Sequence, residues 1–319
     1  MVVLLLSFAL SVSFLKIILP LLTEKLLDIP CDRSSHSIPK PRGGGISFVL
    51  ITFIGCLVFH LTSYSVSHSY IFLLLPLVLV SFLDDFFSLS PYLRALTHFI
   101  TSCLVLFNSP FYYGYLSPLP LFLLLPLFLL ISIFGVAIIN FFNFMDGSDG
   151  LLASCFSVLL IVAFFLFGQP TILLVLIGSL LGFLRFNWPP SLVFMGDVGS
   201  TFLGAIFFGI LLYSDSLTSS ILFILLAAPL LIDPFFTLFR RSYLGHPVFA
   251  PHRLHLYQRL IIAGWSHKNV ALVYCMPILL LSFSWYFLSF SGIAFTFLFY
   301  IFLLFYLNNC FSSPFHNSP

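Results

Sequence analysis

The sequence predicts an all-α protein, built as a polytopic bundle of transmembrane helices. Of its 319 residues, 61% are hydrophobic, only 7% are charged and 43 are Phe. This composition excludes a soluble globular domain, in which about a quarter of the residues carry charge. Apolar runs recur along the chain, and helices satisfy their own backbone hydrogen bonds in a bilayer. We expect a single integral membrane domain over residues 1–319.

The apolar runs indicate about eleven transmembrane helices. Their expected ranges are 2–22, 46–61, 70–83, 93–107, 120–139, 150–167, 171–184, 199–213, 220–238, 269–289 and 291–307. Some ranges are short for a hydrocarbon core of about 30 Å, so these helices are expected to extend into the loops. No basic residue precedes the first run and no small-residue cleavage site follows it, so we interpret it as a transmembrane helix and not a signal peptide.

The basic residues predict the orientation of the bundle. An odd number of helices places the two termini on opposite sides. The Lys and Arg residues lie in or near one set of loops, namely 23–45, 84–92, 140–149, 185–198 and 239–268. The positive-inside rule makes these loops cytoplasmic and the N-terminus periplasmic. We therefore expect the functional site at the cytoplasmic face.

The third cytoplasmic loop carries a regular series of polar residues in apolar surroundings. Asn140, Asn143, Asp146 and Asp149 follow one another at three-residue intervals, which places neighbours on adjoining parts of one helical face. Polar groups beside an apolar wall cost free energy in a membrane protein. The pattern therefore indicates a site for a metal ion or a polar substrate.

The first loop carries Lys40 and Arg42 before three consecutive glycines and the next helix. Exposed amides and the positive end of a helix dipole favour an anion there. A flexible basic loop that touches anionic lipid headgroups explains the same residues equally well.

Acidic residues stand at the ends of two other predicted helices. Asp84 and Asp85 directly end an apolar run, and adjacent carboxylates repel each other unless a cation or a proton intervenes. We favour a functional pair over a solvated helix end. Asp197 begins a helix, where it acts either as a helix cap or as part of a site. Asp233 lies inside an apolar run, and it either lines the same cavity or pairs with a nearby arginine.

The fifth loop carries His252, Arg253 and His255, a pattern that indicates contacts with phosphate. Carboxylate and amide oxygens suit a hard divalent cation, Mg²⁺, with Mn²⁺ as the alternative. These groups beside a lipid-facing wall indicate phosphoryl transfer between a water-soluble donor and a lipid acceptor. No nucleic-acid partner is expected.

Taken in order, the motifs resemble those of the polyprenyl-phosphate N-acetylhexosamine-1-phosphate transferase family. They are Asp84-Asp85, Asn140-x-x-Asn143-x-x-Asp146-Gly-x-Asp149-Gly, Asn187, Phe194-Met-Gly-Asp197-x-Gly-Ser200 and His252-Arg-x-His255. The resemblance implies transfer of a sugar-1-phosphate from a UDP-N-acetylhexosamine to undecaprenyl phosphate, with release of UMP and with Mg²⁺ as cofactor. It also implies a multi-pass protein of the bacterial inner membrane, which could form a homodimer.

The resemblance also implies a role for each motif residue. The expected catalytic residues are Asp84, Asp85 and Asp197, and the expected metal ligands are Asn143 and Asp197. The expected substrate-binding residues are Lys40, Arg42, Asn140, Asp146, Asp149, Asn187, Phe194, His252, Arg253 and His255. Whether Asp84 or Asp85 acts as a base stays open, because a phosphate monoester is already largely ionised near neutral pH.

The sequence departs from the family's motif pattern at two places. The peptidoglycan branch of the family has adjacent histidines in the fifth loop, whereas only His252 and His255 stand here. This favours the branch that starts O-antigen or other surface glycans over a phospho-N-acetylmuramoyl-pentapeptide transferase. Ser88 replaces a third acid found in some relatives. The donor sugar stays open among UDP-GlcNAc, UDP-FucNAc and UDP-QuiNAc.

Two functions from other classes serve as alternatives. A secondary transporter would also carry intramembrane acids, but it would place them near the midplane and show repeated halves. A non-catalytic membrane scaffold predicts no ordered metal site.

Overall fold

The structure, a computed structural model, describes residues 1–30, 38–62, 69–168, 170–214, 216–247, 250 and 252–315. Its helices are α1 (Val2–Lys25), α2 (Ile46–Leu61), α3 (Leu75–Phe87), α4 (Pro91–Phe107), α5 (Leu121–Phe144), α6 (Leu151–Leu166), α7 (Thr171–Asn187), α8 (Asp197–Leu212), α9 (Leu217–Leu226), α10 (Ala228–Tyr243), α11 (Leu256–Ile262) and α12 (His267–Cys310). A 3₁₀-helix η1 (Ser69–Leu74) and a π-helix η2 (Tyr112–Leu116) adjoin α3 and α5. Strands β1 (Leu27–Asp28) and β2 (Lys40–Pro41) form one short antiparallel pair. The described chain is therefore essentially all-α.

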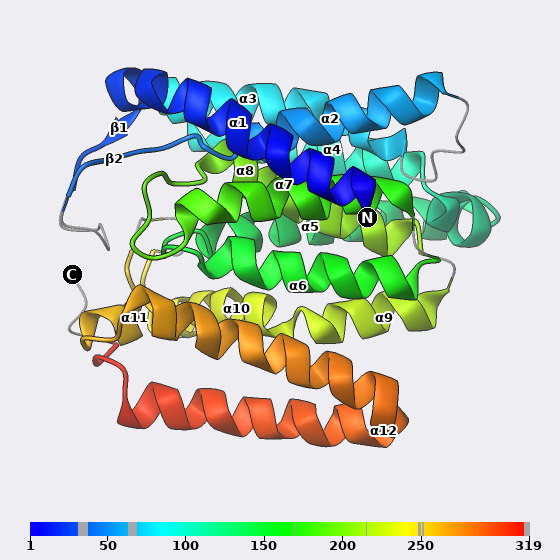
Figure 1. The fold of residues 1–319 in the computed structure, drawn as a ribbon. Coiled ribbons are helices and arrows are strands. Elements are labelled where there is room, and N and C mark those ends of the chain that lie inside the picture. The colour runs from blue at the N-terminus through cyan, green and yellow to red at the C-terminus, as the bar shows by residue number, and fades with distance from the viewer. Residues whose placement is uncertain are drawn as a thin grey trace.

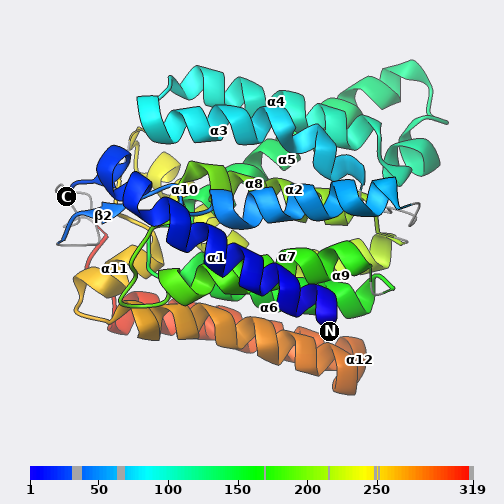
Figure 2. The same cartoon turned by 45° about the horizontal axis from the view of Figure 1, so that its top comes forward.

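The helices lie side by side, and their connections gather at two ends of the bundle (Figure 1). We call one of these the polar end; it consists of residues 27–28, 40–45, 88–90, 145–150, 188–196 and 252–266. Helix α1 begins at the opposite end, and the last arm of α12 finishes at the polar end. Figure 2 shows the same separation from a second direction. The predicted loops of the cytoplasmic face thus come together in space.

Several of the described helices are long and apolar enough to cross a membrane. Five helices qualify within the described ranges, and a sixth span results if the bent pair α9–α10 is counted as one. Five further apolar helices have 10–17 residues. These lengths support a multi-pass membrane protein, while the number of eleven crossings and their orientation stay predictions.

Two expected helix boundaries differ from the structure. The expected helix 220–238 is broken between α9 and α10, which meet at 71°. Pro229 stands in the first turn of α10, where it lacks an N–H and its ring would clash with a continuing helix. The expected ranges 269–289 and 291–307 both fall within the single helix α12. Helix α12 reverses direction along its length, so its two arms run antiparallel (Figure 1).

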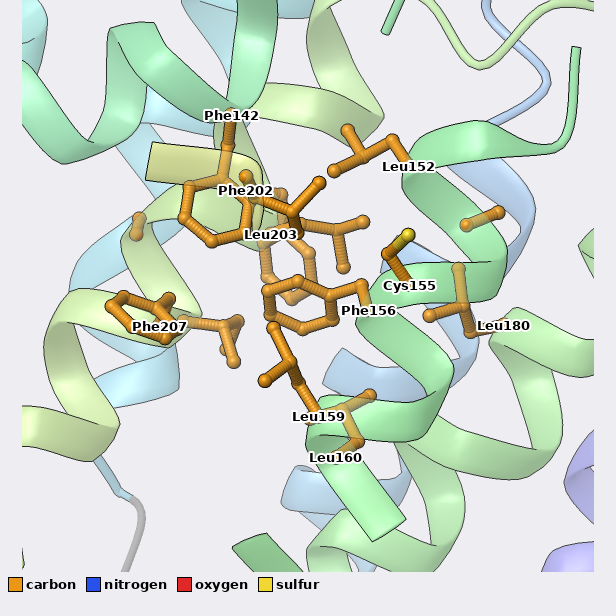
Figure 3. Close-up of a cluster of buried hydrophobic side chains, with 14 of the residues drawn as sticks. Phe142, Leu152, Cys155, Phe156, Leu159, Leu160, Leu180, Phe202, Leu203 and Phe207 are labelled. Atoms are coloured by element: carbon orange, nitrogen blue, oxygen red, sulfur yellow. The ribbon is translucent and has the colours of Figure 1, made fainter. Parts of the chain in front are cut away.

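Helix α8 lies at the centre of the bundle, and every residue from Val198 to Leu212 is buried. Its glycines allow neighbouring helices to approach closely, as small residues do in membrane bundles. A Cβ on Gly204 would lie 2.7 Å from the Cα of Ile139 in α5. Aromatic side chains fill the space around α8, and Figure 3 shows Phe142 and Phe207 in this cluster with their ring centroids 5.1 Å apart. The start of α8 is consequently held in a fixed position at the polar end.

Helix α1 packs against α7 across two glycines four residues apart. A Cβ on Gly178 would lie 2.2 Å from the carbonyl oxygen of Leu4, and one on Gly182 would lie 2.8 Å from that of Phe8. This is the small-residue spacing typical of close helix pairs in membranes. The first predicted helix is therefore an integral part of the bundle.

Candidate functional site at the polar end

The adjacent carboxylates at the end of α3 have different partners. Asp84 accepts a hydrogen bond from the backbone N–H of Leu89, and its Oδ2 lies 3.3 Å from Nη1 of Arg94. Asp85 accepts two hydrogen bonds at the start of α8, from the N–H groups of Asp197 (3.0 Å) and Val198 (3.2 Å). Consecutive helical residues point about 100° apart, so the two side chains face different neighbours. Both carboxylates are buried.

Asp197 starts α8 beside this pair. Its Oδ2 lies 3.5 Å from Nη1 of Arg94, and 30% of its side chain is exposed, compared with 6% for Asp84. Arg94 therefore stands between the carboxylates of Asp84 and Asp197. A second cation, Arg42, donates to the backbone carbonyl of Asp85. The cations that the acidic pair requires thus come from α4 and from the segment after β2.

Asp146 brings a further carboxyl group to the same region from the loop after α5. Burial raises the pKa of the Asp146 carboxyl well above its ordinary value, and the nearby carboxylates of Asp197, Asp85 and Asp149 raise it further. Carboxyl groups from α3, α8 and the α5 loop therefore converge at the polar end. Such a set of oxygens fits a hard divalent cation.

The described side chains do not by themselves enclose a metal site at this place. Among the residues that the structure describes, no group of three His, Cys, Asp or Glu side chains could hold a metal ion. Magnesium commonly binds through one or two carboxylates and takes its other ligands from water and substrate phosphates. The carboxylates at the polar end suit that arrangement better than a metal site closed by protein ligands.

Lys40, Asp149 and Ser191 form a second polar group. The Lys40 Nζ lies 3.1 Å from Oδ2 of Asp149 and 2.9 Å from Oγ of Ser191. The same carboxylate oxygen accepts the N–H of Ser191 at 3.0 Å. Burial raises the pKa of Asp149, but the Ser191 hydrogen bonds and the charges of Lys40 and His267 outweigh it, so the pKa lies below its ordinary value. Asp149 is therefore ionised and paired at neutral pH.

Phe194 adds an aromatic surface to this second group. The Lys40 Nζ lies 5.2 Å from the centroid of the Phe194 ring, which is a cation–π contact. The ring is partly exposed, so one part of its surface stays accessible. The predicted substrate-binding residues Lys40, Asp149 and Phe194 are thus brought together.

Three predicted asparagines have different surroundings. Asn187 is buried and joins two loops, because it accepts the N–H of Gly150 (3.1 Å) and donates to the carbonyl of Val193 (3.0 Å). Asn140 donates to Val136 and lies 3.2 Å from Nδ1 of His98 on α4. The side chain of Asn143 is partly buried and has no hydrogen-bond partner within the described ranges. Its pairing with Asp197 at a metal ion therefore stays a prediction.

The glycine run after Arg42 serves packing at this site. Gly44 and Gly45 donate to the carbonyls of Phe194 (2.9 Å) and Met195 (2.8 Å). A Cβ on Gly45 would lie 2.6 Å from the Cα of Gly199. These two amides are consequently not available to an anion. This corrects the anion site that the sequence suggested for the glycine run. Their close packing places Arg42 beside the start of α8.

The loop that carries His252, Arg253 and His255, which we call the histidine loop, is held by Asp233 of α10. This buried carboxylate accepts the backbone N–H groups of Leu256 (2.8 Å) and Tyr257 (3.2 Å) at the start of α11, and the hydroxyl of Tyr274 (2.6 Å). Removing a capping side chain of this kind costs about 0.5–2 kcal/mol in proteins. The structure therefore identifies Asp233 as a cap of α11, which was neither of the roles considered from the sequence.

The predicted histidines lie directly beside this cap. Nδ1 of His255 lies 3.7 Å from Oδ1 of Asp233, and the rings of His252 and His255 have centroids 4.9 Å apart. Burial lowers the pKa of His252 to about 3, and the nearby His255 and Arg241 act in the same direction. His252 is thus neutral at physiological pH. Arg253, partly buried, lies between the two histidines in the chain.

Two contacts connect the histidine loop to the rest of the polar end. The hydroxyl of Tyr257 donates to the carbonyl of Phe144 at 2.9 Å. His267, at the start of α12, lies 3.0 Å from the Ser148 hydroxyl and 3.2 Å from the backbone nitrogen of Asp149. Sequence reasoning missed Tyr257 and His267, because their partners lie more than a hundred positions away. Arg94 is close to the acidic pair in the chain as well, and its position in the first turn of the next helix already suggested it as a cation beside the pair.

Comparisons with known proteins point to one family. Residues 67–215 match glycosyl transferase family 4. The chain is 37% identical over 148 residues to a protein named probable undecaprenyl-phosphate N-acetylglucosaminyl 1-phosphate transferase of Bacillus subtilis, a match that covers 43% of this chain and 41% of the relative. It is 34% identical over 172 residues to the decaprenyl-phosphate N-acetylglucosaminephosphotransferase of Mycobacterium leprae, which covers 43% of this chain and 42% of the relative.

A longer match joins the chain to the undecaprenyl-phosphate alpha-N-acetylglucosaminyl 1-phosphate transferase of Escherichia coli. The two are 28% identical over 278 residues, which is 81% of this chain and 75% of the relative. In the Bacillus and Mycobacterium comparisons, by contrast, the match spans only about two fifths of the relative's length. Together these similarities confirm the resemblance to polyprenyl-phosphate N-acetylhexosamine-1-phosphate transferases that the motifs indicated.

Proposed function

We propose, from the glycosyl transferase family 4 match of residues 67–215, that this chain transfers N-acetylhexosamine-1-phosphate from a UDP-sugar to undecaprenyl phosphate. The observation that carries the proposal is the gathering of acidic, basic and aromatic groups at one end of an apolar bundle. A water-soluble donor and the phosphate of a membrane lipid can meet only at such an interface. We place this end at the cytoplasmic face of the bacterial inner membrane, because the basic residues collect there.

The proposed step is an in-line displacement. An oxygen of the lipid phosphate attacks the sugar-linked phosphorus of the donor, the bond to the uridine-side phosphate breaks, and UMP leaves. The attacking phosphate needs little help from a base, since its second pKa is about 6. Catalysis would then rest on positioning and on neutralising charge. Arg94 and Arg42, which stand around Asp84 and Asp85, are suited to the second task.

The carboxylates at the polar end fit Mg²⁺, with Mn²⁺ as the alternative. Asp197 is the best placed holder, because it is partly exposed at the start of α8 and lies near the carboxyl group of Asp146. Asn143, with a partly buried side chain at the end of α5, is the second candidate. When bound, the ion supplies charge neutralisation to the donor diphosphate.

The remaining groups suit the donor nucleotide. Stacking of a base on an aromatic ring is worth about 1–3 kcal/mol, and the partly exposed ring of Phe194 offers such a surface. Lys40 and Asp149 lie beside it and could contact the nucleoside. His252, Arg253 and the buried His255 lie at the same end, and the family resemblance is what supports a contact of this loop with the diphosphate or the sugar. A neutral His252 would act there through hydrogen bonds and not through charge.

The test is a transfer assay in membranes that contain this chain, with undecaprenyl phosphate, Mg²⁺ and a panel of UDP-sugars. We expect UMP release that depends on the lipid phosphate, and a lipid-extractable sugar. UDP-GlcNAc is the first donor to test, because the relatives named above are N-acetylglucosaminyl transferases. The absence of product with every donor, from folded and inserted protein, would refute the proposal. Size measurements in detergent would test the proposed homodimer.

A further inference from the structure

We infer that Asp85 is a positioning residue, which fixes the start of α8 and thereby the place of Asp197. This inference deepens the proposed function and rests on it, since it assigns Asp85 a task other than touching a substrate. Asp84 and Asp85 would then have different tasks. Asp84 is paired with Arg94, while Asp85 is turned toward the backbone of α8.

Both oxygens of Asp85 are already engaged. Oδ1 accepts the N–H of Asp197 at 3.0 Å and Oδ2 accepts that of Val198 at 3.2 Å. The side chain is buried, with 3% of the residue exposed. The first amides of a helix have no partner within the helix, and they carry the positive end of its dipole. Asp85 therefore satisfies these amides from another helix, 112 positions away.

Helix α8 has no cap of its own. The residue before it is Gly196, which lacks a side chain and has a φ of 77°. A Cβ at Gly196 would lie 2.7 Å from Oδ2 of Asp85 and 2.7 Å from the nitrogen of Gly43. The glycine is therefore required for the carboxylate of Asp85 to reach the helix.

Asp197 is consequently held at two points. Its backbone nitrogen donates to Asp85, and its side chain lies 3.5 Å from Arg94. A ligand that must hold a cation against a diphosphate gains from such fixation, because small displacements of a catalytic group reduce rates strongly. The position of the Asp197 carboxylate would thus depend directly on Asp85.

The primary test is hydrogen exchange of the peptide that contains the first turn of α8, measured for Asp85→Asn in membranes or detergent. An asparagine offers one acceptor and would turn an N–H donor toward the other amide, so we expect exchange there to quicken about tenfold. In the transfer assay, kcat should fall while the KM for the UDP-sugar changes by less than about twofold. The Mg²⁺ concentration for half-maximal activity should rise.

Asp84→Asn is the matched control, because it removes the same charge one residue away. We expect it to leave exchange at the start of α8 unchanged, although it should lower activity. Gly196→Ala provides a second route to the same disturbance, and it keeps the test possible if Asp85→Asn does not accumulate. Its control is Gly168→Ala, which has a similar φ of 76° but no neighbouring atoms within 4 Å.

Normal exchange at α8 in Asp85→Asn, together with a raised KM for either substrate, would overturn the inference and make Asp85 a substrate contact. If the wild type turns over no UDP-sugar but exchange is still faster in Asp85→Asn, the positioning of Asp197 by Asp85 is upheld. In that case it is the proposed function that fails.

Discussion

At the scale of single residues, five aspartates at or near the polar end differ mainly in their surroundings. Asp85 and Asp233 accept backbone N–H groups at helix starts, and Asp149 is paired with Lys40. Asp197 is partly exposed, and Asp146 faces other carboxylates. The same side chain thus serves as a helix cap, as an ion-pair partner or as a candidate metal ligand. Burial and neighbouring donors decide which.

Asp197→Asn should reduce kcat by at least about a thousandfold, because the ligand charge is lost while the shape of the side chain is kept. The amount of inserted protein and its thermal stability should stay near wild type. Initial rates at saturating substrates, normalised to inserted protein, measure the effect. Rates near wild type would remove Asp197 from the site.

Acidification should destabilise the protein through His252. Its folded pKa of about 3 lies below the ordinary value of 6.5, so the unfolded chain binds a proton more readily between these values. Stability should therefore fall as the pH drops below about 6.5. Asp149, whose folded pKa is depressed, contributes stability that is lost only at pH values below its ordinary pKa.

The measurement is the unfolding temperature in detergent at pH 7.5 and at pH 5, for the wild type and for His252→Gln. The variant should show a smaller decrease on acidification, because Gln does not titrate. An equal decrease in both proteins would contradict a neutral His252 in the folded protein.

At the scale of elements, side chains from one segment hold the backbone of another. Asp85 of α3 holds α8, Asp233 of α10 holds α11, and Asn187 at the end of α7 joins the loops at Gly150 and Val193. Glycines complete these contacts where backbones approach. The loops at the polar end are consequently fixed by contacts with distant helices and not by their own sequence.

Asp233→Ala should release α11 and the histidine loop from α10. Two backbone amides and the Tyr274 hydroxyl would lose their acceptor, each at a cost of about 1–3 kcal/mol when it stays buried. We expect faster proteolysis between residues 244 and 256 and a large loss of transfer activity. Thr237→Val, which removes one donor to Asp233, should have a much smaller effect. Unchanged proteolysis in Asp233→Ala would exclude the capping role.

Gly45→Ala should separate α2 from α8. The added Cβ would lie 2.6 Å from Gly199 and 2.8 Å from the Met195 carbonyl, and backbone at that distance must move. We expect a lower unfolding temperature and reduced activity, corresponding to about 1–3 kcal/mol of overpacking. Gly114→Ala is the control, since no atom lies within 4 Å of its added Cβ. Similar stability of the two variants would argue against close packing at Gly45.

At the scale of the whole molecule, charge and chemistry are concentrated at one end of an apolar bundle. The carboxylates of Asp84, Asp85 and Asp197, the group around Lys40 and the histidine loop all lie at the polar end. The helix η2 and the end of α8 lie at the opposite end (Figures 1 and 2). This separation is what the positive-inside rule requires of a cytoplasmic site. It also distinguishes the chain from a transporter, whose polar groups would lie near the midplane.

Cysteine labelling of a cysteine-free background would test this orientation. Leu192→Cys at the polar end and Tyr113→Cys in η2 are suitable, because these side chains are 57% and 59% exposed. We expect an impermeant reagent added outside spheroplasts to label position 113 and to label position 192 only after the membrane is opened. Ser191 is a poor probe because it is buried against Lys40. Labelling of both positions from outside would refute the orientation.

The sequence by itself determined the membrane class, the approximate helices, the expected side for the polar loops and the reaction family. These properties follow from hydropathy, charge distribution and motif order, which are all read along one dimension. It left open what each polar group contacts. Asp84 and Asp85 looked equivalent, Asp233 had no evident partner, and the glycine run resembled an anion cradle.

Only the tertiary structure decided these points. Asp85 and Asp197 are 112 positions apart, and Lys40 and Asp149 are 109 apart, so their contacts depend on how the helices pack. The glycines at 44 and 45 became packing residues because the backbone before α8 occupies the space where a ligand was expected. The physical reason is that a helix determines the direction of each side chain locally, whereas its partner is determined by whichever distant segment the bundle places there.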